Sequence, residues 1–300
     1  MSMNKPHVVS VIVNWNGKED LRECLDSLIQ VEYEPFSIVV VDNGSSDGSV
    51  AFVSTHYPNV EIVSLSHNRG YAFGLNQGIF RALEKKADYI FVLNNDTATE
   101  PLAILQLVEV MESDKTIGIA APKVLYYHQR TKIFSLGDRS YRWLPLPIGF
   151  GYRKRDHPAY NKVMEFDYVT GCAMMVRSEV FYKVGLFDTR YYMYYEDADF
   201  CRRAREKGYR IVCVGHAVVY HKTAQSTGKK KRFFVRIRAR NRVWFYRRYR
   251  HGPHPWLTYA ALWLLAFGRS LRHVTRKEWE LVVPYWKGFL EGWCEPNARR

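Results

Sequence analysis

The sequence predicts an α/β protein built on a mainly parallel central sheet, and three observations lead to this fold class. Apolar runs at residues 8–13, which Ser10 alone interrupts, and at 38–41 and 90–93 are typical of parallel strands that are buried on both faces. Helical patterns alternate with these runs, which predicts right-handed crossover connections. Each run ends in polar residues, and ligands of open parallel sheets bind beyond the carboxyl ends of the strands.

The individual elements follow from local patterns. Leu21, Cys24, Leu25 and Leu28 recur at helical spacing, and acidic residues near the start of this segment suit the helix dipole. The predicted strands are a first strand at residues 8–14, further strands at 37–41, 60–65, 116–125 and 168–176, and short strands at 211–214 and 217–220. The other predicted helices lie near residue 50, at 71–84, from Pro101 onward and before Gly208. Residues 126–167 lack a clear period, which predicts a lid or a binding loop.

Two common nucleotide-binding motifs are absent. Gly70, Gly74 and Gly78 are spaced every four residues and follow polar residues, so they do not form the dinucleotide-binding fingerprint. No Gly-x-x-x-x-Gly-Lys-Ser/Thr segment occurs, which argues against a P-loop kinase or ATPase. We expect these three glycines to let one helix lie close to the sheet.

Composition limits the class of protein further. A chain of 300 residues with 47% hydrophobic residues is long enough for a sizeable core. Its five cysteines are scattered and odd in number, which argues against a disulfide framework or a zinc site and suits a reducing compartment. No secretory signal is expected at the N-terminus, and no apolar run reaches the 18 residues of a standard spanning helix.

Oxygen-bearing side chains follow the predicted strands. Asn94-Asn95-Asp96 closes the run at 90–93, and Asp42 and Asp47 come after the second strand. Asn and Asp are ordinary turn residues. A lone carboxylate between amides also suits a hard divalent cation that takes its other ligands from water and a diphosphate.

A second acidic group, Glu196-Asp197-Ala198-Asp199, opens a helix directly after a segment with four tyrosines. We expect Asp199 to cap the helix or to form a structural ion pair. An aromatic wall beside a carboxylate is a common way to hold a sugar ring near a base. Asp197 is therefore a candidate base.

Together these segments resemble family 2 glycosyltransferases, the inverting enzymes of GT-A fold, and within them the bacterial rhamnosyltransferase-like branch. The resemblance covers residues 8–228 and implies the fold of a nucleotide-diphospho-sugar transferase. It is carried by six motifs in order: Val-Ser-Val-Ile-Val-Asn-Trp-Asn-Gly, Val-Val-Asp-Asn-Gly-Ser-Ser-Asp-Gly-Ser, Asn-Arg-Gly-Tyr-Ala-Phe-Gly, Leu-Asn-Asn-Asp-Thr, Gly-Cys-Ala-Met-Met-Val-Arg and Tyr-Tyr-Glu-Asp-Ala-Asp-Phe.

The resemblance also implies roles for single residues. Asp42 would bind the base or ribose of the donor, Asp96 would be the main carboxylate on Mg²⁺ or Mn²⁺, and Asp197 would be the catalytic base. His221 resembles a further metal ligand of some relatives, although a single His after a strand is often structural. The other implied residues are Asn14, Asn16, Asn43, Arg69, Asn94 and Asn95 on the donor side, and Gly171, Cys172, Tyr195 and Glu196 on the acceptor side.

Two positions depart from the family's pattern. Asn43 stands where many relatives carry a second acid, which leaves the identity of the donor's base open. Asn94 replaces the first acid of an Asp-x-Asp metal motif, so metal binding is expected to be weaker than in a site with two acids.

The basic charge belongs to the C-terminal third. Residues 1–206 hold 23 Lys+Arg and 26 Asp+Glu, a net charge of −3, whereas residues 207–300 hold 21 and 4, a net charge of +17. The segment 229–250 carries eleven Lys/Arg interleaved with aromatic residues, and residues 256–267 are almost entirely apolar. Such a pattern suits interfacial helices on anionic lipid.

We therefore expect a catalytic domain at residues 1–228 and a basic amphipathic extension at residues 229–300 that is peripheral at the cytoplasmic face of the inner membrane. The alternatives for the extension are packing on the catalytic domain with solvated arginines, and nucleic-acid binding on charge alone. Its many tryptophans are unusual for a nucleic-acid-binding arm, so no nucleic-acid partner is expected.

The expected function is inverting transfer of a sugar, with rhamnose as the candidate, from a nucleotide-diphosphate donor to a saccharide or polyprenyl-linked acceptor in cell-envelope polysaccharide synthesis. A metal would stabilise the leaving diphosphate, and a carboxylate would take the proton of the acceptor hydroxyl. A sugar-nucleotide pyrophosphorylase is an alternative, although Asn14-Trp15-Asn16-Gly17 matches its Gly-rich loop poorly. A non-catalytic binding protein on a degenerate transferase domain is another.

Overall fold

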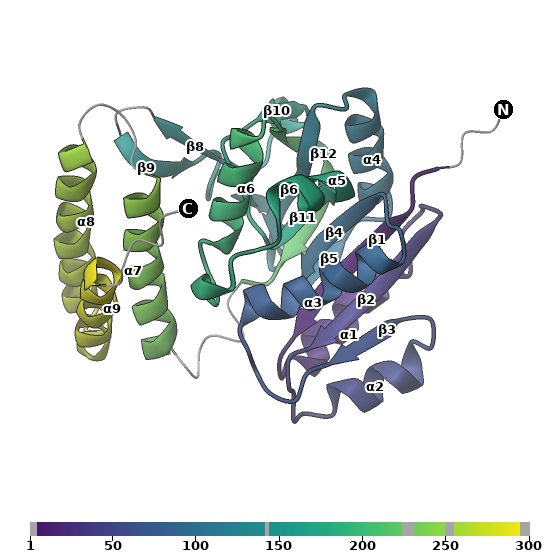
Figure 1. Ribbon diagram of the computed structural model, residues 1–300, viewed down its shortest axis with the longest axis horizontal. Helices are drawn as coiled ribbons and strands as arrows, with labels where there is room; N and C mark the ends of the chain where they lie inside the picture. The colour runs from purple at the N-terminus through teal and green to yellow at the C-terminus, as the bar shows by residue number, and fades with distance from the viewer. Residues whose placement is uncertain (1–4, 142–143, 224–230, 250–254, 295–300) are drawn as a thin grey trace. The chain divides into compact units, whose positions relative to one another are not determined.

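The computed structural model describes residues 5–141, 144–223, 231–249 and 255–294, which form two compact units (Figure 1). The first unit comprises Met1–Arg139, Gly149–Tyr192 and Asp197–Gln225, and the second comprises Ser140–Ile148, Met193–Glu196 and Ser226–Arg300. The boundary predicted between residues 228 and 229 lies outside the described residues.

The first unit is built on one large sheet with parallel central strands, as predicted. Its strands are β1 (Val8–Asn14), β2 (Phe36–Asp42), β3 (Glu61–Ser64), β4 (Tyr89–Asn94), β5 (Thr97–Thr99), β6 (Ile117–Tyr126), β7 (Gln129–Ser135), β10 (Val163–Glu165), β11 (Ala173–Arg177) and β12 (Arg210–His221). They lie in the order β10-β12-β6-β11-β4-β1-β2-β3, with β5 beside β12 and β7 beside β6 (Figure 1). Strand β11 runs antiparallel to both of its neighbours, β4 and β6.

Helices cover both faces of this sheet, which explains the continuous apolar strands. The helices of the unit are α1 (Lys18–Leu28), α2 (Ser49–His56), α3 (Tyr71–Glu84), α4 (Ala103–Ser113), α5 (Ser178–Val184) and, from Asp197 onward, α6 (Glu196–Glu206). Val8 and Ile12 of β1 belong to the core cluster that contains the apolar residues of α1 and α4. Val9 and Val11 belong to the other cluster, with the apolar residues of α3. Because neighbouring residues of β1 face opposite layers, both sets must be apolar.

The glycines of α3 allow the close packing that the sequence predicts. A Cβ atom at Gly78 would overlap with Val11 and Val41, and one at Gly74 would touch Val13. Helix α3 therefore lies against β1 and β2 at a distance that larger side chains would prevent.

Three predicted elements need correction. The short strands predicted at residues 211–214 and 217–220 are one strand, β12, whose register against β6 shifts between Val214 and Val218. The strand predicted at 168–176 begins only at Ala173, because residues 168–172 form a loop at the site described below. The segment 126–167 contains β7, β10 and a separate pair, β8 (Asp138–Tyr141) and β9 (Leu144–Gly149).

The second unit contains three long helices, α7 (Lys231–Arg248), α8 (Pro255–Thr275) and α9 (Val282–Cys294). Helices α7 and α9 approach closely, since a Cβ atom at Gly288 would overlap with the carbonyl group of Arg236. Helix α7 buries Phe234, Ile237 and Val243, whereas Phe233 is exposed.

Helix α8 carries an exposed apolar face. Leu262 and Ala266 are buried on one side, whereas a stripe of apolar residues is exposed on the other: Trp256, Ala260, Leu264, Phe267 and Leu271. We call these five residues the α8 stripe. Among the described residues, no helix has both the length and the hydrophobicity that crossing a bilayer requires.

Candidate functional site

The carboxyl ends of β1, β2 and β4 form one row in the first unit. Asn14 at the end of β1 is in register with Asp42 of β2, and its neighbour Val13 is in register with Asn94 of β4. The three polar ends therefore lie side by side, as the sequence predicts for a binding edge.

Asn14 connects the two flanking strands. Its side chain is fully buried, and its Nδ2 donates to Asp42 Oδ1 at 3.4 Å. Its Oδ1 accepts a hydrogen bond of 2.8 Å from Asn95 Nδ2. A Cβ atom at Gly17 would overlap with the Asn95 amide, so the small residue after Asn16 leaves room for this contact. Asn14 thus fixes the spacing of Asp42 and Asn95.

The loop after β2 is held by its own polar side chains. Asp42 Oδ2 accepts from the Ser45 amide at 2.9 Å, and Asn16 Oδ1 accepts from the Ser46 amide at 2.7 Å. Burial raises the pKa of Asp47, but hydrogen bonds from Ser49 and Lys18 outweigh it and the pKa is lowered. The Asp47 carboxylate is therefore occupied in shaping the loop.

Asn43 and Arg69 are also brought together. The buried Asn43 accepts at Oδ1 from the Arg69 amide at 3.0 Å and donates to the Gly70 carbonyl at 3.0 Å. The Arg69 side chain is exposed, and its guanidinium carbon lies 3.5 Å from the centre of the Phe73 ring. An accessible cation therefore stands beside the row of strand ends.

The sequence predicts Asp96 and His221 as metal ligands, and the structure places these two side chains next to each other. Strand β5 pairs with β12 so that Thr97 is opposite His221, which brings His221 Nε2 to 3.1 Å from Asp96 Oδ1. Both residues are buried, and His221 Nδ1 has no hydrogen-bond partner. A carboxylate oxygen and an imidazole nitrogen at this separation suit Mg²⁺ or Mn²⁺.

Asp96 and His221 would fill only two coordination positions of such an ion and leave the others for further ligands. Within the described residues, no group of three or more His, Cys, Asp or Glu side chains is arranged to hold a metal ion. Hard divalent cations that bind through one or two protein groups take their remaining ligands from water and phosphate oxygens. The donor set therefore fits an ion that arrives with, or is completed by, a diphosphate.

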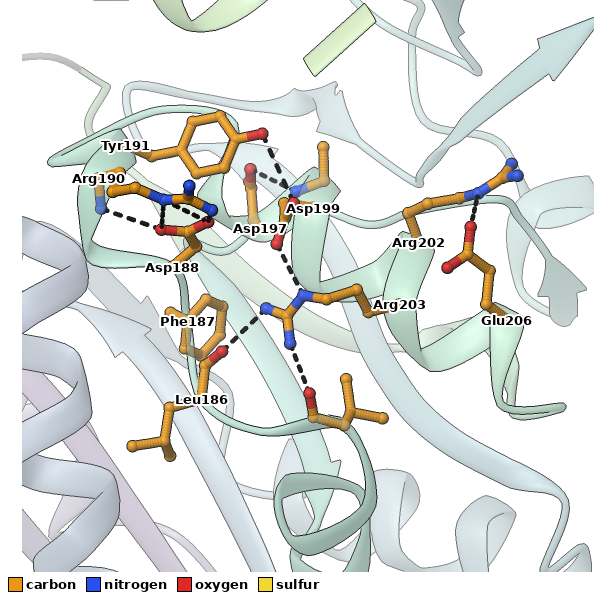
Figure 2. A network of polar contacts seen from close by, with 12 residues as sticks. Leu186, Phe187, Asp188, Arg190, Tyr191, Asp197, Asp199, Arg202, Arg203 and Glu206 are labelled. Carbon is orange, nitrogen blue, oxygen red and sulfur yellow. Dashed lines mark hydrogen bonds and ion pairs between the residues drawn. The ribbon is translucent and has the colours of Figure 1, made fainter. Parts of the chain in front are cut away.

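Asp197 lies at the start of α6, where backbone amides orient its carboxylate. Gly171 N donates to Asp197 Oδ2 at 2.9 Å, and Ala198 N donates to Asp197 Oδ1 at 2.8 Å. A Cβ atom at Gly171 would press against Asp197, so a glycine is required at this approach. Figure 2 shows Asp197 on the first turn of α6, beside Asp199.

Tyr71 links this carboxylate to the row of strand ends. Its hydroxyl lies 2.9 Å from Asn94 Oδ1 and 3.3 Å from the Gly171 carbonyl oxygen, and Asn94 N donates to the Cys172 carbonyl at 2.9 Å. Hydrogen bonds and short stretches of backbone therefore connect Asp42 with Asp197. The structure brings the predicted donor, metal and base residues of the first unit to one edge of the sheet.

Asp199 has a structural role, as predicted. It is fully buried and accepts a hydrogen bond of 2.8 Å from Arg203 Nε (Figure 2). Arg203 also donates to the carbonyl groups of Val184 and Leu186, which ties α6 to the loop after α5. This network fixes the helix that carries Asp197.

The predicted acceptor-side residues are divided between the units. Gly171 and Cys172 lie next to Asp197, and burial raises the pKa of the Cys172 thiol to about 12, which keeps it neutral. Tyr195 and Glu196 belong to the second unit, where Arg242 Nε donates to the Tyr195 hydroxyl at 2.9 Å.

The sequence-based reasoning missed Asp138. Its carboxyl group is partly buried, and burial and the charge of Asp197 raise its pKa to about 6. Asp138 pairs with Tyr168 through the backbone, just before the loop that contacts Asp197. The residue lies in a segment without a clear period, so the sequence carries no signal for it.

Comparisons with solved structures show the fold. A mannosyltransferase from Pyrobaculum calidifontis in complex with GDP-Man and Mn²⁺ has a TM-score of 0.61 at 16% identity, over 97% of this chain and 88% of that chain. GalNAc-T7 with UDP, GalNAc and Mn²⁺ has a TM-score of 0.60 at 17% identity, over 82% of this chain and 50% of that chain. The fold is therefore the GT-A fold of glycosyltransferases.

Comparisons with characterised sequences point to one branch. An N-acetylglucosaminyl-diphospho-decaprenol L-rhamnosyltransferase from Mycobacterium tuberculosis is 27% identical over 91% of this chain and 96% of its own length. Rhamnosyltransferase WbbL from Escherichia coli is 29% identical over 71% of this chain and 83% of its own. Residues 10–185, more than half of the chain, match the family described as "Glycosyl transferase family 2". The chain belongs to this family and is a rhamnosyltransferase-like glycosyltransferase.

Proposed function

We propose that this glycosyltransferase moves an L-rhamnosyl residue from a nucleotide-diphosphate donor to a saccharide or polyprenyl-linked acceptor in cell-envelope polysaccharide synthesis, with inversion of the anomeric carbon. The observation that supports it is the convergence of Asp42, Asp96 and Asp197 along one hydrogen-bonded edge. The names of the two rhamnosyltransferase relatives support the choice of sugar.

The donor would lie along the row of strand ends. Asp42 and the loop that it anchors would bind the base or ribose, with Asn14, Asn16 and Asn43 holding that loop in place. The exposed guanidinium group of Arg69 would offset negative charge on the diphosphate.

Asp96 and His221 would hold a divalent cation, with the amides of Asn94 and Asn95 beside it. When bound, such an ion would supply positive charge against the leaving diphosphate. The separation of 3.1 Å between His221 Nε2 and Asp96 Oδ1 supports this assignment.

Asp197 would act as the general base. The backbone N–H groups of Gly171 and Ala198 donate to its two carboxylate oxygens and fix the orientation of the carboxylate. As the hydroxyl oxygen attacks the anomeric carbon from the face opposite the diphosphate, its proton would pass to Asp197. The bond to the diphosphate oxygen breaks in the same step, so the configuration inverts without a covalent intermediate.

We further propose that residues 1–228 are the catalytic domain and that residues 229–300 bind the anionic cytoplasmic face of the inner membrane. The α8 stripe supports this proposal, because Leu264 is 74% exposed and Phe267 is 59% exposed. The net charge of +17 over residues 207–300 complements anionic lipid. Liposome flotation tests the proposal, and failure to float with anionic vesicles would refute it.

The two alternatives left open by the sequence are weakened. Membership of glycosyl transferase family 2 does not support a sugar-nucleotide pyrophosphorylase. A degenerate binding protein would need neither a carboxylate that two backbone amides orient nor a buried Asp–His pair.

A direct assay of sugar transfer tests the proposed function. The full chain is incubated with Mn²⁺, nucleotide-diphosphate sugars including the L-rhamnosyl donor, and a short-chain N-acetylglucosaminyl-diphospho-prenol. We expect a product heavier by one deoxyhexose that requires both the metal and the acceptor. Metal-dependent transfer of another sugar would refute the choice of rhamnose, and absence of transfer from every donor would refute the function.

A further inference from the structure

Lys222 directly follows His221, and its side chain is buried between two acids of α1. The side chain is 8% exposed, and its Nζ lies 2.9 Å from both Asp20 Oδ1 and Glu23 Oε2. The Tyr127 hydroxyl donates to Glu23 Oε2 at 2.8 Å, and the ring centre of Tyr127 is 5.1 Å from Lys222 Nζ. Two carboxylates and one aromatic ring therefore hold a single ammonium group at the end of β12.

The backbone of Lys222 is bonded to Asp96, which forms the proposed metal pair with His221. Lys222 N donates to the Asp96 carbonyl at 2.9 Å, and Tyr127 N donates to the His221 carbonyl at 3.0 Å. Neighbouring side chains of an extended chain point in opposite directions, so the His221 ring contacts Asp96 while the Lys222 side chain reaches α1. Lys222 is therefore joined to His221 through the chain and to Asp96 through a hydrogen bond.

The same side of α1 also holds the chain before and after Asp96. Cys24 Sγ donates to the Asn94 carbonyl at 3.6 Å, and Ser27 Oγ accepts from Thr99 N at 3.0 Å. The two acids that hold the ammonium group precede Cys24 and Ser27 by four positions each, and residues at this spacing lie on one side of a helix. Helix α1 thus fixes both the segment that contains Asp96 and the residue that follows the histidine of the metal pair.

The charges of this cluster are compatible with a metal ion nearby. An ammonium group alone would repel a divalent cation, but the two carboxylates of Asp20 and Glu23 accompany Lys222 and outweigh its charge. If the ammonium group were removed, the two carboxylates would lose the cation between them. The contact that ties α1 to the end of β12 would then be lost, and with it a restraint on the residue next to His221.

We propose that Lys222 is a positioning residue of the metal pair, which keeps His221 Nε2 and Asp96 Oδ1 at a separation that suits one divalent cation. Asp20 and Glu23 act through Lys222, because they hold its side chain on α1. Outer partners of this kind orient the ligands before the metal binds, so less free energy is lost in ordering them on binding. The proposal rests on the metal site of the proposed function and names the residues that preform it.

The experiment titrates the full chain with Mn²⁺ alone and follows the electron paramagnetic resonance signal of the free ion. His221→Ala defines the binding that remains without the site. We expect Lys222→Met, which keeps the length of the side chain and removes its charge, to weaken Mn²⁺ binding at the site about tenfold or more. The control is Lys123→Met, which breaks a buried ion pair with Asp156 in the same unit and should keep the wild-type affinity.

A cycle of single and double variants tests whether the acids act through Lys222. Asp20→Asn alone should also weaken Mn²⁺ binding, and it should cause no further loss in the Lys222→Met background, because partners in one contact are not additive. Additive losses would overturn the positioning role. Asp20 is 21% exposed, so Asp20→Asn keeps the test valid if Lys222→Met does not fold.

Two further results would overturn the proposal. One is wild-type Mn²⁺ affinity in Lys222→Met, and the other is an equal loss in Lys123→Met, which would reflect lower stability alone. If the wild type and His221→Ala bind Mn²⁺ equally, the proposed metal site itself fails. If His221→Ala binds weakly and Lys222→Met binds as the wild type does, only this inference fails. Failure of the proposed function is recognised separately, as absence of sugar transfer by the wild type.

Discussion

At the scale of single residues, Asp138 combines a partly buried carboxyl group with a charged neighbour. Burial and Asp197 raise its pKa from 3.8 to about 6. The folded protein therefore holds this proton more tightly than the unfolded chain does. As the pH rises from about 4 to about 6, ionisation of Asp138 lowers the free energy of unfolding by on the order of 2 to 3 kcal/mol.

Replacing Asp138 by a residue that does not ionise should prevent this fall in the free energy of unfolding. We predict that Asp138→Asn is more stable than the wild type at pH 8 and gains nothing near pH 4, because asparagine does not ionise. Urea unfolding at the two pH values measures the difference. The control Glu109→Gln removes an exposed acid from α4 and should keep the wild-type pH dependence. Equal destabilisation of Asp138→Asn at both pH values would contradict the prediction.

His221 is the second residue with a testable role, because it could be a metal ligand or only a packed side chain beside Phe134. Its Nε2 is 3.1 Å from Asp96 Oδ1 and its ring centre is 4.8 Å from that of Phe134. We predict that His221→Ala raises the Mn²⁺ concentration needed for half-maximal transfer by roughly tenfold or more.

The matched control for this measurement is His216→Ala, which removes an exposed histidine from the same strand. It should leave the Mn²⁺ dependence unchanged. If His221→Ala lowers the melting temperature and its half-saturating Mn²⁺ concentration equals that of the wild type, His221 is structural.

At the scale of elements, α8 has one packed side and one exposed apolar side. We predict that Leu264→Glu with Phe267→Glu abolishes flotation of the full chain with anionic vesicles, because two charges are placed where acyl chains would be. Flotation of the chain with vesicles of anionic and of neutral lipid gives the bound fractions.

The control for the stripe is Ile29→Glu with Tyr182→Glu, which makes the same change of charge at exposed apolar residues of the first unit. This double variant should float as the wild type does. Equal loss in both double variants would assign binding to net charge and would remove α8 from the proposal.

The elements also show what sequence patterns can predict. The bounds of β1 and α3 agree with their predictions, because both are long and their apolar residues face a core. The pattern across Gly215 and His216 suggests two strands, whereas β12 continues with a shift of register. In residues 126–167 the short strands pair with distant partners, and no local pattern reveals such pairing.

At the scale of the whole chain, the same distinction applies to the candidate site. Asp42 and Asp96 could be placed at one edge because parallel strands align their carboxyl ends. Asp138 could not be placed, since its environment depends on Asp197, 59 positions further along the chain. The arginines of the second unit read as one basic run, and only the helix packing separates Arg236, which is paired with Glu291, from Arg242, which is not paired with an acid.

The most direct measurement is the comparison of donor affinity with turnover in Asp197→Asn. Asparagine keeps the shape of the side chain and cannot take the acceptor's proton, and a general base typically contributes about 10² to 10⁴ in rate. We predict that kcat falls by about that factor while the Kd for the nucleotide-diphosphate sugar with Mn²⁺ stays within about threefold of the wild type, a change of under 1 kcal/mol. Donor affinity that falls as far as turnover, or a variant that transfers sugar at the wild-type rate, would contradict the role of Asp197.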